Sequence, residues 1–142
     1  MQPQSTDLRW EEMPPPSDRT AEPWIRLSVN NSQAPGTPMA HIALSRAVLD
    51  RLGWEPGQTA LVLRVGRDGA GQPVCLELRS TAPGEIGRAL RPTRTAARSG
   101  QFYSILPADM SRRLVSRDMQ RWETDQRNGG LLRIDITGLF AK

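Results

Sequence analysis

The side chains that most often carry out catalysis are scarce in this chain of 142 residues. His41 is the only histidine and Cys75 the only cysteine, whereas a zinc site takes three or four protein ligands. A Ser-His-Asp triad would have to use His41, and no G-x-S-x-G sequence presents a nucleophilic serine. The glycine-rich segment 66–71 lacks the lysine of a phosphate-binding loop. We therefore expect no catalytic residue, no metal site and no cofactor, and the chain is predicted not to be an enzyme.

Arginine provides the other candidate chemistry, which is the binding of phosphate. Segment 87–100 (GRALRPTRTAARSG) is rich in arginine, and no acidic residue lies between Glu85 and Asp109. Arginine forks fit phosphate oxygens, and the threonine, serine and glycine between them allow a close backbone approach. A solvated linker between two halves of the chain would have the same composition, so both interpretations stay open. The arginines of this segment are Arg88, Arg91, Arg94 and Arg98.

Further along the chain, arginines recur every fourth residue at Arg113, Arg117 and Arg121. On a helix this spacing places the side chains on one face, where they could follow a phosphate backbone. Asp118 and Glu123 are close enough in sequence to neutralise part of this charge. An ordinary solvated helix face would show the same pattern.

The charge distribution divides the chain into an acidic tail and a basic body. Residues 1–23 hold five prolines, five acidic residues and almost no aliphatic side chains, which is typical of a disordered or extended segment. The tail carries a net charge of −3 and the whole chain +4, which leaves +7 for residues 24–142. A basic body favours polyanionic partners, because released counterions drive such binding.

The acidic tail also contains a candidate motif for docking a protein partner. Trp10 is followed by Glu11 and Glu12 and then by three consecutive prolines. An aromatic side chain among acids and prolines is typical of short docking motifs. A tail residue that is simply exposed to solvent would look the same in the sequence.

Hydrophobic periodicity predicts the elements that position these side chains. Alternation indicates strands over residues 24–30, 59–65, 74–79 and 131–138, and two further short strands are expected over 39–45 and 102–106. Ser45 is suited to cap a helix over residues 46–52, and Gly53 is suited to end it. Pro107 is suited to open a second, longer helix, and a short helix could form near residues 85–90. The apolar face of the longer helix would contain Met110, Leu114, Val115, Met119 and Trp122.

An internal similarity relates the two expected helix starts. Residues 44–52 (LSRAVLDRL) and 106–114 (LPADMSRRL) align without gaps at an offset of 62. A duplication would explain the similarity and would make the chain a covalent pseudo-dimer. Two strand-to-helix junctions that obey the same capping rules would also look alike without a common origin.

Residues 41–65 (HIALSRAVLDRLGWEPGQTALVLRV) resemble the swapped-hairpin domain of the AbrB/MazE/SpoVT class. RAVLDRLGW matches the helix of that class, EPGQ matches its turn and TALVLRV its following strand, and the likeness extends over roughly residues 24–79. The chain departs from the pattern in three places. Ser45 replaces the usual proline, Gln58 replaces the acid after the turn glycine, and the loop NNSQAPGTP replaces a short hairpin turn.

The resemblance implies a fold of the α+β class that is mainly β. It implies a small swapped-hairpin-like β-barrel with two helices, built by a homodimer or by two tandem copies in one chain, after a disordered tail. The expected divisions are a tail over 1–23, an AbrB-like β-β-α-β-β unit over 24–80, and a basic linker with a second strand-helix-strand unit over 81–142. In DNA-binding relatives the first hairpin contacts DNA, and the matching positions are Arg26, Asn30, Asn31, His41 and Arg46.

These observations predict a non-enzymatic protein that binds double-stranded DNA, either as a transcriptional regulator or as an antitoxin-like protein. The alternative is an interaction or structural protein of a phage or mobile element, whose tail docks a partner and whose fold is a scaffold. The first residues lack the basic start and apolar core of a signal peptide, and no apolar run approaches the ~20 residues of a membrane span. We therefore expect a cytoplasmic location and no membrane contact.

Overall fold

The computed structural model describes residues 8–11, 22–34, 37–93 and 99–140. Within these ranges the chain is mainly β, with one α-helix and two short 3-10 helices. The elements are β1 (Ile25–Ala34), β2 (Thr37–Leu44), α1 (Arg46–Leu52), β3 (Ala60–Arg67), β4 (Pro73–Ser80), β5 (Arg88–Ala89), β6 (Arg91–Pro92), β7 (Gly100–Ile105), η2 (Ala108–Met110), β8 (Leu114–Asp118), β9 (Trp122–Asp125), η3 (Arg127–Gly129) and β10 (Leu131–Asp135).

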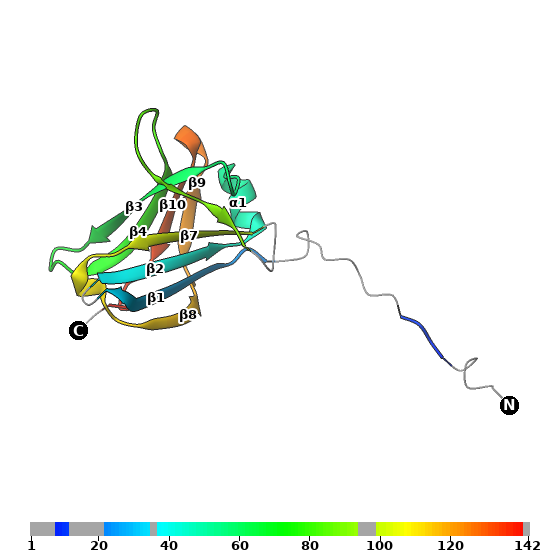
Figure 1. The fold of residues 1–142 in the computed structure, drawn as a ribbon, viewed down its shortest axis with the longest axis horizontal. Coiled ribbons are helices and arrows are strands. Elements are labelled where there is room, and N and C mark those ends of the chain that lie inside the picture. The colour runs from blue at the N-terminus through cyan, green and yellow to red at the C-terminus, as the bar shows by residue number, and fades with distance from the viewer. Residues whose placement is uncertain (1–7, 12–21, 35–36, 94–98, 141–142) are drawn as a thin grey trace.

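The strands form two five-stranded antiparallel sheets (Figure 1). The first sheet has the order β6-β7-β2-β1-β8, and the second has the order β5-β3-β4-β10-β9. The chain passes from the second sheet to the first between β5 and β6, and returns between β8 and β9. Both sheets are open among the described residues, since no strand pairing joins one sheet to the other. The expected swapped-hairpin-like barrel with two helices is therefore wrong.

One cluster of buried apolar side chains fills the space between the sheets, because both sheets alternate apolar residues inward and polar residues outward. The first sheet contributes Ile25, Leu27, Val29, Ala40, Ile42, Leu44, Phe102 and Leu114, and the second contributes Leu61, Leu76, Leu78, Leu132 and Ile134. The alternation predicted from sequence for β1 and β4 is confirmed by this burial pattern, and β2 alternates buried and partly exposed residues along its whole length. No helix in the described part of the chain is long and apolar enough to cross a membrane.

The helix α1 closes one end of the cluster, and its predicted boundaries are confirmed. The Ser45 hydroxyl accepts hydrogen bonds from the backbone amides of Val48 (3.4 Å) and Trp24 (3.1 Å). Gly53 ends the helix with a φ of 72°, a conformation that glycine adopts without strain. Trp54 follows it, is 1% exposed, and donates from its Nε1 to the carbonyl of Gly129 at 2.7 Å.

The long second helix expected from Pro107 onward does not form. The segment contains η2, β8 and β9 instead, and the expected helix near residues 85–90 is replaced by a turn and β5. In the segment after Pro107, β8 pairs with β1, so that Leu114 lies opposite Val29, and the Met119 amide donates to the Ile25 carbonyl at 2.8 Å. Met110, Leu114 and Met119 still face the core, but from separate short pieces, while Val115 is 79% exposed. Helical spacing therefore arose here from three independent core contacts.

Candidate nucleic-acid interface

The side of the first sheet that faces away from the core is the candidate site, and we call it the outer face. Strand register places its side chains in three rows across the sheet. One row joins Asp118, Arg26, Ala43, Gln101 and Arg91; the next joins Ser28, His41 and Tyr103; the third joins Asn30, Met39 and Ile105. These residues alternate with the buried positions of the same strands, which is why they point outward.

A hydrogen-bonded ring pair occupies the middle of the outer face. The imidazole of His41 stacks on the ring of Tyr103, with the ring centroids 4.5 Å apart and the planes at 24°. The Nε2 of Gln101 donates to the carbonyl of Pro92 at 3.1 Å, which turns its Oε1 toward the two rings. That oxygen lies 3.0 Å from Nε2 of His41 and accepts from the Tyr103 hydroxyl at 3.3 Å. Since an amide oxygen only accepts, the neutral His41 carries its hydrogen on Nε2.

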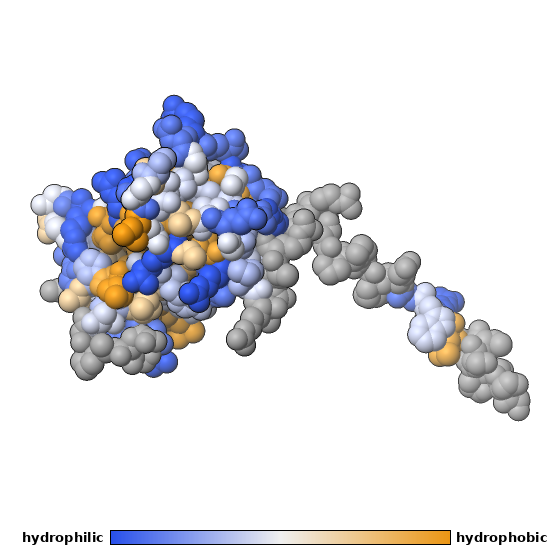
Figure 2. Space-filling model, turned by 45° about the horizontal axis from the view of Figure 1, so that its top comes forward, coloured by the Kyte–Doolittle hydropathy of each residue, from blue (hydrophilic) through white to orange (hydrophobic). Residues whose placement is uncertain are grey.

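The Tyr103 ring is exposed on the side of β7 that faces away from β2. The short strand β6 pairs only with Gln101 and Gly100 of β7, so it does not extend beside Tyr103. Tyr103 is accordingly 42% exposed, and Ile105 on the same strand is 50% exposed. Figure 2 shows small hydrophobic patches between hydrophilic regions on the side of the molecule that it presents. The outer face therefore combines an accessible aromatic ring with charged neighbours.

The two arginines of the outer face have different surroundings. The Nε of Arg26 lies 2.8 Å from Oδ1 of Asp118, and its guanidinium lies 4.5 Å from the centre of the Trp24 ring. Arg91 is exposed and forms no ion pair among the described residues. Of this pair, Arg91 has the guanidinium that an incoming anion can reach without displacing a carboxylate.

The outer face brings together four residues that the sequence singled out for DNA contact: Arg26, Asn30, His41 and Arg91. Arg46 lies instead on α1, where ion pairs to Asp50 (2.7 Å) and Glu55 (3.0 Å) compensate its charge. Hydrogen bonds from Arg46 to Glu55 and Asp50 raise the pKa of its guanidinium above the ordinary value. Both carboxylates compete with any phosphate for this side chain.

The remaining predicted contact residues lie elsewhere. The Asn31 amide donates to the carbonyl of Ser111, and Arg88 belongs to β5 of the second sheet. Arg94 and Arg98 lie outside the described residues. The arginines expected on one helix face are also separated, because they occupy the approach to β8, β8 itself and the approach to β9; they are Arg113, Arg117 and Arg121.

Sequence reasoning missed the aromatic part of the site. Tyr103 and Gln101 were available as the outward positions of an alternating strand, opposite the inward Phe102. Their proximity to His41 depends on the pairing of β7 with β2, which joins residues about 60 positions apart and has no local signal. Trp24, which precedes β1, likewise became relevant only through its contact with Arg26.

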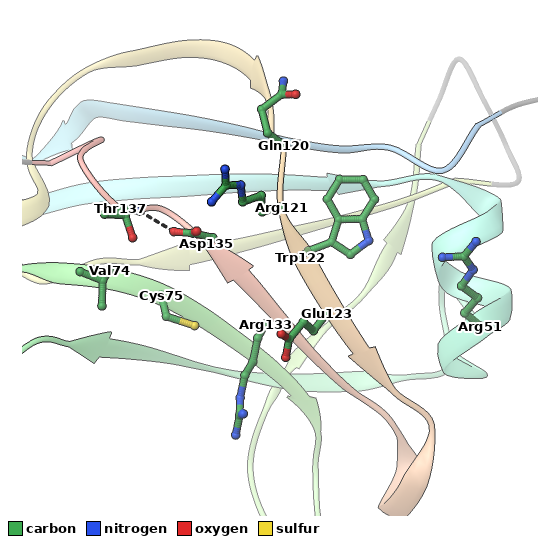
Figure 3. Close-up of a pocket in the computed structure, with 10 residues that line it drawn as sticks. All are labelled: Arg51, Val74, Cys75, Gln120, Arg121, Trp122, Glu123, Arg133, Asp135 and Thr137. Atoms are coloured by element: carbon green, nitrogen blue, oxygen red, sulfur yellow. Dashed lines mark hydrogen bonds between the residues drawn. The ribbon is translucent and has the colours of Figure 1, made fainter.

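A cleft of about 710 Å³ lies on the other side of the molecule, beside β9 and β10 (Figure 3). Burial raises the pKa of the Cys75 thiol in its wall, which disfavours the reactive thiolate. Hydrogen bonds from Thr137 lower the pKa of Asp135, and Arg133 is engaged by Glu77 at 2.9 Å. The described residues contain no cluster of three or more His, Cys, Asp and Glu side chains that could hold a metal ion. The cleft thus presents charged groups that stabilise one another rather than an activated nucleophile.

Two residues of the candidate docking motif, Trp10 and Glu11, lie in the described stretch of residues 8–11. Trp10 is 89% exposed and Leu8 is 59% exposed, and Glu11 is exposed as well. Glu12 lies outside the described residues.

Comparison of the chain with family models, with curated proteins and with solved structures gives no match. The AbrB-like motif therefore stays a prediction from residues 41–65.

Proposed function

We propose that this chain is a non-enzymatic DNA-binding protein, acting as a transcriptional regulator or an antitoxin-like protein, and that the outer face is its DNA interface. The observation that carries the proposal is the convergence of Arg26, Asn30, His41 and Arg91 on one exposed sheet face. Arginine anchors phosphates, while asparagine and histidine can hydrogen-bond to bases.

Electrostatics supports the same proposal. Residues 24–142 carry a net charge of +7, because the chain as a whole carries +4 and residues 1–23 carry −3. Within the described residues, the arginines at both sheet edges include several without an ion pair; they are Arg88, Arg91, Arg113, Arg117 and Arg121. A surface of this kind attracts a polyanion from a distance, and the attraction weakens as salt screens it.

The test is the salt dependence of binding to a labelled 30-base-pair duplex, followed by fluorescence anisotropy. Binding is expected at low salt, with log K falling linearly as log salt concentration rises. Arg91→Ala should lower the slope by about 0.9, the value for one lost phosphate contact. Arg127→Ala is the matched control, since Arg127 is paired with Asp125 at 2.9 Å and belongs to the second sheet's side of the molecule. Absence of binding at about 50 mM salt, both to this duplex and to either of its separated strands, would refute the proposal.

A second candidate function follows from the exposure of Trp10, which is 89%. In this alternative the tail docks a protein partner and the two sheets are a scaffold. Deletion of residues 1–23 distinguishes the two functions. DNA binding should survive or strengthen, because the deleted segment is acidic, whereas binding to a partner recognised through Trp10 should be lost.

A further inference from the structure

The width of the first sheet limits the form of DNA that its outer face can read. Five strands at about 4.8 Å spacing place the outer strands about 19 Å apart, whereas the major groove of duplex DNA is about 12 Å wide. A helix or a two-stranded ribbon enters that groove, but a face of this width does not. His41 lies on β2, two strands or about 10 Å inside the β8 edge, and one strand inside the β7 edge because β6 does not extend beside Tyr103. Base edges inside a duplex are therefore beyond its reach.

The ring pair of His41 and Tyr103 is instead suited to bases that have left the duplex. Unpaired bases bind proteins by stacking on aromatic rings, including rings that project from the face of a sheet. The Tyr103 ring is 42% exposed, and both rings are held in place through the single Oε1 of Gln101. Rings that are already fixed lose little conformational freedom when a base stacks on them.

The charges around the ring pair determine on which side of it a nucleic-acid phosphate is favoured. Arg91 lies at the β6 edge, one row from Tyr103, and has no carboxylate partner among the described residues. At the opposite end of the same row, Arg26 is already bound by Asp118. A phosphate is thus favoured beside Arg91 and disfavoured beside Asp118.

We infer that the outer face binds single-stranded DNA in preference to duplex DNA, with an unpaired base on the Tyr103–His41 rings and a phosphate on Arg91. This inference rests on the proposed function, since it specifies the form of DNA that the same face binds. Ile105, which is 50% exposed beside Tyr103, extends the apolar surface available to the sugar and base.

The experiment compares one labelled 15-nucleotide strand alone and annealed to its complement, using the full chain and fluorescence anisotropy. The free strand is expected to bind at least tenfold more tightly than the duplex. Tyr103→Leu should weaken binding of the free strand by roughly 5- to 150-fold, the range for one lost stacking contact, and leave duplex binding unchanged. Tyr103→Phe keeps the ring and should remain within about threefold of the parent protein.

Two controls distinguish base stacking on the rings from non-specific hydrophobic binding. Val115→Ala removes an exposed apolar side chain from β8, away from the rings, and should leave both affinities unchanged. A 2-aminopurine base at the centre of the strand should lose fluorescence on binding to the parent protein and keep it with Tyr103→Leu. Folding of each variant is checked by its urea midpoint.

The outcomes distinguish the inference from the function on which it rests. Equal or tighter binding of the duplex, or an equal effect of Tyr103→Leu on both forms, overturns the inference and leaves DNA binding intact. Unquenched 2-aminopurine in a bound strand also overturns it. If neither form binds at low salt, the proposed function fails as well.

Discussion

The packing of Gly130 against Trp54 allows a sharp test of how the end of α1 is held against the turn between η3 and β10. Gly130 is buried between η3 and β10, with a φ of 98°, a conformation that residues with a Cβ rarely adopt. A Cβ built on Gly130 would lie 2.5 Å from Nε1 of Trp54 and 2.8 Å from the carbonyl oxygen of Leu52. The second of these atoms is backbone, so it cannot rotate away.

The substitution Gly130→Ala therefore combines two costs. Backbone strain at positive φ costs about 1–2 kcal/mol for a residue with a Cβ. Overpacking against a buried ring and a fixed carbonyl adds about 1–3 kcal/mol. The shift also disturbs the hydrogen bond from Trp54 to the neighbouring Gly129 carbonyl, which measures 2.7 Å. We expect a loss of about 2–5 kcal/mol, a large part of the roughly 5–15 kcal/mol that stabilises a typical domain.

Gly138→Ala is the matched control for this prediction. Gly138 also has a positive φ, of 84°, but a Cβ there meets no atom within 4 Å. It should lose only the strain, about 1–2 kcal/mol. Urea unfolding followed by circular dichroism measures both free energies, with the slope of each transition checked for constancy. If Gly130→Ala costs no more than Gly138→Ala, the close packing of Trp54 on this turn contributes nothing and the reasoning is wrong.

Two further predictions concern the helix cap and the acid range. Ser45→Ala should lower the free energy of unfolding by about 1–2 kcal/mol in the same assay. The reason is that Ser45 is only 4% exposed and its hydroxyl accepts hydrogen bonds from the backbone amides of both Val48 and Trp24. An unchanged free energy of unfolding would show that the cap is dispensable. The Arg79 guanidinium and the Ala82 amide lower the pKa of Glu85 from 4.5 to about 2, so the stabilisation is present above pH 4.5 and is lost as pH falls toward 2. The stability difference between the parent protein and Glu85→Gln should therefore shrink over that interval, and a difference that stays constant with pH would refute the assignment.

The local parts of the fold could be predicted because their causes are local. Ser45 and Gly53 bound α1 through hydrogen bonds within a few residues, and their effect does not depend on the rest of the chain. The alternation of Ile25, Leu27 and Val29 indicates a half-buried strand before its partner is known. Four residues of the outer face were also named from the sequence: the AbrB-like resemblance pointed to Arg26, Asn30 and His41, and the arginine-rich segment 87–100 pointed to Arg91.

The segment after Pro107 shows why local patterns predicted a helix that does not form. Its apolar residues recur at helical intervals, and capping chemistry permits a helix at Pro107. The open edge of β1 competes for the same backbone, and pairing of Leu114 opposite Val29 gives the segment hydrogen bonds and core contact together. That competition is decided between parts of the chain more than 80 residues apart, and no local pattern records it.

The sequence by itself thus determined the helix, most strands, the basic body and the presence of a single histidine and a single cysteine. Only the tertiary structure decided that the sheets stay open, and that His41, Gln101, Tyr103 and Arg91 meet on one face. The physical reason is that periodicity reports which side of its own strand a residue occupies, whereas strand order and register decide which residue of another strand stands beside it.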